Sequence, residues 1–112
     1  KCKNKNWLGV ILACVSPEII EKTIDEVKQL NIPFGYKANL WKIDEPLPHN
    51  AWESTTGEIG INPTKVMGTR GDYTDIMFLE FSKKMFSKGA TILGGCCETK
   101  PSHIKKISIL KN

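Results

Sequence analysis

The residues of this 112-residue chain that are best suited to chemistry are its cysteines. Cys14 ends an apolar run, Cys96 and Cys97 stand side by side after two glycines, and Cys2 lies in a polar start. Three converging thiolates would make a zinc site with one open position, as in catalytic rather than structural zinc sites. Such a site can bind and deprotonate a substrate thiol. Two other interpretations stay open at this point: small buried hydrophobic side chains or a redox pair.

Adjacent cysteines can share one metal only where the chain turns, because neighbouring side chains on a regular strand point to opposite faces. Gly94 and Gly95 precede the pair and are expected to give the backbone the freedom for such a turn. Cys14 also follows an apolar segment. Active sites of parallel β/α folds lie at the C-terminal ends of the strands. We therefore expect the three sulfur atoms at that end of a sheet.

Apolar segments alternate with helical patterns along the chain. The sequence predicts strands over 7–14, 32–38 and 90–96, and helices capped by Ser16, Asp72 and Thr99 that end near residues 31, 88 and 110. Between residues 39 and 71 there is little periodicity. The alternation predicts an α/β fold with parallel strands and flanking helices. Three strands make a thin sheet, and their apolar composition indicates partner strands in a longer protein or in another chain.

Residues 94–104 resemble the zinc motif of the homocysteine S-methyltransferase family. They read Gly-Gly-Cys-Cys-Glu-Thr-Lys-Pro-Ser-His-Ile, and the family motif reads Gly-Gly-Cys-Cys-x-Thr-x-Pro-x-His-Ile. In that family a cysteine at an earlier strand end, before a helix start of the Ser-Pro-Glu kind, is the third ligand, and Cys14 matches it. Asn39 matches the asparagine that ends the intervening strand. Ala13 and Ala38 depart from the asparagine and proline that the family usually has there.

The resemblance implies a (β/α)8 TIM barrel, with residues 1–112 as the C-terminal part and its last three strands. It implies Zn²⁺ held by Cys14, Cys96 and Cys97, with Asn39 contacting the substrate or supporting the site. The implied reaction moves a methyl group from a donor to the thiol of homocysteine and gives methionine. The alternative is a degenerate or split fragment that binds zinc or thiols without catalysis. Such a fragment would associate with another chain or with a missing N-terminal half.

Composition narrows the class of protein further. The chain is 40% hydrophobic and 25% charged, and no stretch reaches the roughly 18 apolar residues of a membrane helix. Its net charge of +4 comes from scattered lysines and a single arginine, Arg70, which we interpret as a surface residue. We expect neither nucleic-acid nor membrane partners. Because no secretory signal is recognisable, we expect reduced cysteines and a cytoplasmic location. His103 is expected to hydrogen-bond locally in the last helix.

Overall fold

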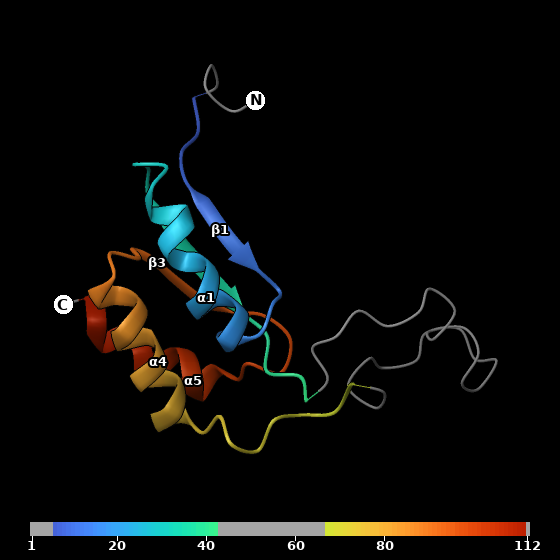
Figure 1. Cartoon of the computed structure of the whole chain (residues 1–112). Helices are drawn as coiled ribbons and strands as arrows, with labels where there is room; N and C mark the ends of the chain where they lie inside the picture. Colours follow the sequence, from blue (N-terminus) through green and yellow to red (C-terminus); the bar gives the residue numbers. More distant parts are fainter. Residues whose placement is uncertain (1–5, 43–66, 112) are drawn as a thin grey trace.

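The computed structural model describes residues 6–42 and 67–111, which form an alternating β/α arrangement (Figure 1). In chain order the elements are β1 (Val10–Ala13), α1 (Pro17–Lys28), β2 (Phe34–Ala38), α4 (Asp75–Ser87), β3 (Ile92–Gly95), α5 (Pro101–Ile107) and the 3-10 helix η1 (Ser108–Lys111). Cys2 and most of the segment without periodicity lie outside the described residues. In the part of the chain that is described, no helix has the length and apolar character needed to cross a membrane.

The three strands are parallel and lie side by side in chain order, with β2 in the middle. Ala13 near the end of β1 pairs with Lys37, and Lys37 pairs with Gly94 of β3. The C-terminal ends of the strands are therefore nearly level. This confirms the predicted α/β class: an open parallel sheet with alternating helices, consistent with part of a (β/α)8 barrel.

The helices pack on one face of this sheet and form the core with it (Figure 1). Alternate residues of β2 point to that face, so Phe34, Tyr36 and Ala38 are buried among apolar side chains of α1 and α4. Tyr36 donates a 2.5 Å hydrogen bond to the hydroxyl of Ser82 in α4. Because the hydroxyl of this buried ring has a hydrogen-bond partner, Tyr36 leaves no unpaired polar group on the helix side of β2.

The other face of the sheet is left open by the described elements. Ile11 of β1 is 47% exposed, Lys37 of β2 is exposed, and Leu8 just before β1 is 95% exposed. Among the described residues, β1 and β3 each pair with a strand on one side only. Among the described residues, both edge strands therefore keep one side free for further hydrogen bonding.

The helix caps agree with the sequence at one helix and differ at two. Ser16 caps α1 as predicted, with its hydroxyl accepting from the first turn. The cap of α4 is Thr74 rather than Asp72, and the N-cap position of α5 is Lys100 rather than Thr99. Asp72 instead accepts hydrogen bonds from Arg70, and Thr99 donates its hydroxyl to the Ala38 carbonyl.

Candidate metal centre

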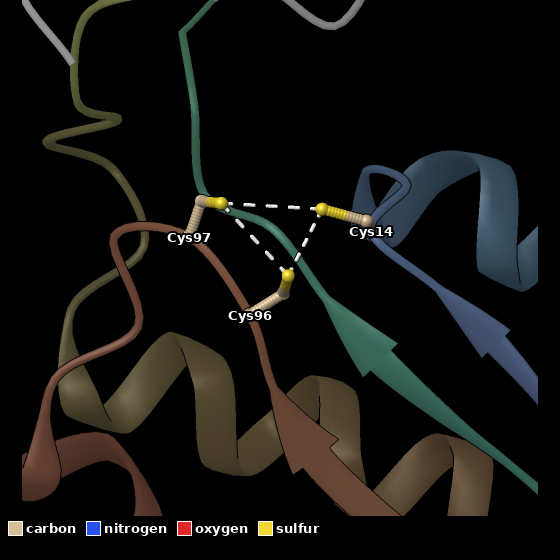
Figure 2. A group of neighbouring side chains, drawn as sticks. All are labelled: Cys14, Cys96 and Cys97. Carbon is tan, nitrogen blue, oxygen red and sulfur yellow. Dashed lines mark hydrogen bonds between the residues drawn. The ribbon is translucent and has the colours of Figure 1, made fainter. Parts of the chain in front are cut away.

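Three cysteines from opposite ends of the chain converge at the C-terminal edge of the sheet. Cys14 directly follows β1, and Cys96 and Cys97 directly follow β3, on the two sides of β2. The Sγ atoms of Cys14 and Cys96 are 2.9 Å apart, and Cys97 Sγ is 3.9 Å from each of them. Figure 2 shows all three side chains pointing into the same space. The three sulfur atoms therefore lie together at the C-terminal ends of the strands, where the sequence predicts them.

Cys14 reaches this space because its backbone leaves the strand pattern. Its φ angle is 60°, in the left-handed region that non-glycine residues rarely adopt. Two hydrogen bonds hold it there: its backbone N–H donates to the carbonyl of Lys37 at 2.8 Å, and its own carbonyl accepts from Asn39 Nδ2 at 2.8 Å. The local strain at Cys14 is therefore balanced by contacts from β2 and the residue after it.

The Cys96–Cys97 turn is pinned to the chain that continues from β2. Cys96 donates its backbone N–H to the carbonyl of Ala38 at 2.7 Å, and the carbonyl of Cys97 accepts from the N–H of Leu40 at 2.9 Å. Thr99 closes the turn, with its N–H donating to the Cys96 carbonyl at 3.2 Å and its hydroxyl to the Ala38 carbonyl at 3.2 Å. Both sides of the pair are thus fixed by main-chain groups.

The glycines before the pair act differently from the prediction. Gly94 and Gly95 lie in β3 with no positive φ, and the left-handed residue of the turn is Glu98, with φ 62°. What Gly95 provides is space, because a Cβ at this position would lie 2.1 Å from Thr99 Cγ2. The turn can fold back over the strand end only where the strand has no side chain on that face.

Asn39 is a supporting residue of the Cys14 segment in this structure. It is only 4% exposed. Besides the bond from its Nδ2 to Cys14, its Oδ1 accepts from the N–H of Trp41 at 3.3 Å, and its own N–H donates to the Val15 carbonyl at 3.0 Å. Both ends of the amide are therefore occupied by protein groups. Its predicted contact with substrate stays a prediction.

The three thiols differ in how readily they lose a proton. The hydrogen bond with Cys96 raises the pKa of Cys14 to about 12, and burial adds to this shift. Burial acts to raise the pKa of Cys96, but hydrogen bonds from Cys14 and from the backbone of Cys97 lower it overall. Burial and the hydrogen bond with Cys96 raise the pKa of Cys97. Cys96 is therefore the sulfur that most favours a negative charge among the three.

The donor set fits a soft divalent cation. The three Sγ atoms lie within 4.8 Å of one another, and all three thiols are free. Sulfurs on one tetrahedral zinc lie about 3.8 Å apart, so the two distances of 3.9 Å match and the 2.9 Å contact is about 0.9 Å short. The shortest distance is still well beyond a disulfide bond of about 2.05 Å. Partial exposure of all three also argues against inert core cysteines.

A segment before α4, residues 67–73, ties the two sides of the cluster together. Arg70 makes paired hydrogen bonds to both oxygens of Glu18 in α1, at 2.7 and 2.8 Å, and to Asp72 at 2.7 and 3.1 Å. Thr69 donates a 2.6 Å hydrogen bond to Glu98, next to Cys97. The side chain of Arg70 is 18% exposed, and these contacts add a link to its interpretation as a surface residue.

The contacts of Arg70 extend to the segment that follows β2 as well. Its N–H donates to the Leu40 carbonyl at 2.9 Å, and its guanidinium lies 4.5 Å from the ring centre of Tyr73. Its neighbour Thr69 forms an isolated antiparallel bridge with Trp41. The sequence signal that could have found this link is that Arg70 is the chain's only arginine and lies near the end of the non-periodic segment.

His103 is buried at the start of α5, as expected for a local structural histidine. Its Nδ1 accepts from the backbone N–H of Lys100 at 2.9 Å. Its Nε2, 3.0 Å from the Tyr73 carbonyl, is then the nitrogen that carries the proton and donates. The ring therefore anchors α5 to the segment before α4 and does not enter the sulfur cluster.

Comparison with known proteins gives one match over nearly the whole chain. The sequence model of the homocysteine S-methyltransferase family matches residues 1–110. No curated protein and no solved structure matches the chain.

Proposed function

The chain belongs to the homocysteine S-methyltransferase family, and from this premise we propose that it serves zinc-dependent methyl transfer to the thiol of homocysteine, giving methionine. The observation that carries the proposal is the convergence of Cys14, Cys96 and Cys97 at the C-terminal edge of a parallel sheet. The family match covers all three of these cysteines, and their positions in the fold agree with it. The match rests on sequence over the whole chain, and the agreement on three sulfur positions.

In this proposal the three cysteines hold the ion and leave one position for the substrate thiol. Zinc bound there would supply positive charge that lowers the pKa of the incoming thiol. Asn39 fixes the Cys14 carbonyl and so keeps one of the three sulfurs in place. The homocysteine sulfur forms a bond to the methyl carbon of the donor while the bond from that carbon to its leaving group breaks in line. The protein's share is to hold and orient the reactants.

We propose further that residues 1–112 are the C-terminal part of a barrel domain whose other strands come from elsewhere. The support is the open apolar face with Ile11 and the free edges of β1 and β3 among the described residues. In a closed barrel that face becomes the interior. Homocysteine and a methyl donor are the proposed ligands. The three free thiols suit a reducing compartment such as the cytoplasm.

A second candidate is a zinc- or thiol-binding fragment that does not catalyse and that pairs with another chain. The specific observation in its favour is the same open sheet. Exposed apolar residues in and just before an edge strand, such as Ile11 and Leu8, favour association with another chain. The two candidates share the metal site. They differ in whether methyl transfer follows when the metal is bound.

Zinc content and methyl transfer, measured on the same preparation, test both. We expect one zinc per chain, and we expect Cys14→Ala, Cys96→Ala and Cys97→Ala each to weaken zinc binding by more than about 100-fold, because each removes a direct ligand. Cys2→Ala is the matched control, since the family motif does not use it. Methionine formed from homocysteine and a methyl donor supports the enzyme. Zinc without methionine supports the fragment, and zinc binding that survives all three substitutions contradicts both.

A further inference from the structure

A lysine projects from the open face of the sheet, next to the cysteine cluster. Tyr36 and Ala38 on either side of Lys37 point into the helix-covered core, so the Lys37 side chain points to the opposite face, where it is exposed. In the register, Lys37 lies between Ala13 and Gly94. Cys14 directly follows the first of these, and Cys96 comes two residues after the second.

The neighbours of Lys37 leave room for a ligand. Ala13 has only a methyl group and Gly94 has no side chain, so the strands on both sides leave the space around the lysine stem free. The carbonyl of Lys37 also accepts from the N–H of Cys14. This bond fixes the strand position of Lys37 relative to Cys14, and its pairing with Gly94 fixes it relative to the strand that ends just before Cys96.

Lys37 has no acidic partner among the described residues. Three other lysines do pair with carboxylates on the helix side of the molecule: Lys83 with Glu80, Lys84 with Glu21 and Lys88 with Asp25. An ammonium group between small residues, on a face that carries Ile11 and Ile92, gains little from those surroundings. The Lys37 ammonium is available to an anion that arrives with a ligand, and a hydrogen bond between two charged groups is among the stronger ones.

We propose that Lys37 binds the carboxylate of a carboxylate-bearing thiol whose sulfur occupies the open position of the cysteine cluster. This assignment rests on the proposed function and adds to it a residue that selects the substrate. The chain then recognises an amino-acid thiol at two points, its sulfur at the cluster and its carboxylate at Lys37. A thiol without a carboxylate would keep only the first contact.

Cobalt(II) bound to the full chain gives a readout that does not need catalysis, because its absorption changes when a thiolate joins it. The titrants are homocysteine and 3-aminopropanethiol, the same molecule without the carboxylate. We expect homocysteine to bind at least about tenfold more tightly, the size expected for a hydrogen bond between charged groups. In Lys37→Met the two thiols should bind within about twofold of each other, and Lys37→Arg should keep most of the difference. Lys105→Met, in an exposed part of α5, removes the same charge and should change nothing.

The outcomes separate this assignment from the proposed function. Equal binding of the two thiols by the unsubstituted chain, or an unchanged preference in Lys37→Met, overturns the assignment while the metal site stands. Equal weakening of both thiols in Lys37→Met also overturns it, since the lysine then acts on the cluster alone. A methyl donor that bears a carboxylate is the other source of this chemistry. Such a donor, which itself has no thiol group, is added in excess to both titrations. If the unsubstituted chain then binds homocysteine no more tightly than 3-aminopropanethiol, Lys37 serves the donor and the assignment to the thiol is wrong. Failure to bind cobalt overturns the proposed function and this site together.

Discussion

The two sides of the cysteine cluster are held in place by different means. Cys14 adopts a left-handed conformation, and its carbonyl depends on one side chain, that of Asn39. Cys96 and Cys97 are held by main-chain hydrogen bonds to Ala38 and Leu40, which survive most substitutions. The difference teaches that the Cys14 side is sensitive to loss of a polar group, whereas the paired cysteines are sensitive to packing around their turn.

The largest effect is expected from adding a methyl group under the turn, with Gly95→Ala. The new Cβ would lie 2.1 Å from Thr99 Cγ2 and 2.4 Å from Thr99 Cβ, so the turn that carries the paired cysteines must move. We expect the free energy of unfolding to fall by about 3 kcal/mol, as in other overpacked sites. Chemical denaturation measures the stability, and a cobalt titration should show weaker binding.

Gly71→Ala is the matched control for this change. A Cβ at Gly71 meets no atom within 4 Å, so its stability and cobalt affinity should be close to those of the unsubstituted chain. If Gly95→Ala behaves like the control, the close approach of Thr99 does not constrain the turn. The paired cysteines would then be held by their main-chain bonds alone, and the comparison between the two sides would need revision.

A smaller loss of stability but a clear loss of metal affinity is expected from Asn39→Asp. The carboxylate keeps the shape of the side chain but removes the Nδ2 donor, which leaves the Cys14 carbonyl facing an acceptor. We expect about 2 kcal/mol lower stability and metal binding weakened by about 10- to 100-fold, as for other residues that orient metal ligands. Asn39→Ala removes the donor without adding charge. If both variants bind cobalt normally, the left-handed conformation of Cys14 does not need Asn39.

The cysteine motif and the alternation of elements could be predicted from the sequence because both are local patterns. Apart from Asn39, which the family resemblance indicated as a substrate or supporting residue, the residues that fix the cluster could not, for physical reasons. Cys14 leaves the strand pattern through a backbone conformation that its residue type disfavours, so nothing in the sequence marks it. Gly95 was expected to supply flexibility and instead supplies space, which depends on where Thr99 folds back. Arg70 binds a carboxylate 52 positions away, and no spacing rule reaches that far.

The smallest effect is expected at the 67–73 segment, which contacts both sides of the cluster at once. Arg70→Met removes the paired hydrogen bonds to Glu18 and Asp72. Because both carboxylates are largely exposed, we expect a loss of only about 1 kcal/mol at neutral pH. Lys83→Met breaks an exposed pair within one helix and should cost less. A loss for Arg70→Met no larger than for Lys83→Met would show that the segment does not link the two sides.

The pH dependence sharpens this last prediction. Arg70 holds the pKa of Glu18 below its ordinary value of 4.5 and that of Asp72 below 3.8. A carboxylate whose pKa is lowered by folding contributes stability above its unfolded pKa, and that contribution is lost as the pH falls through the folded pKa. The gap in stability between the unsubstituted chain and Arg70→Met should therefore be full near pH 7 and shrink once the pH drops below about 4.5. Denaturation curves at pH 7, 5 and 3 measure it, and a gap that stays constant across them would mean that Arg70 acts through its contact with the Tyr73 ring rather than through its ion pairs with Glu18 and Asp72.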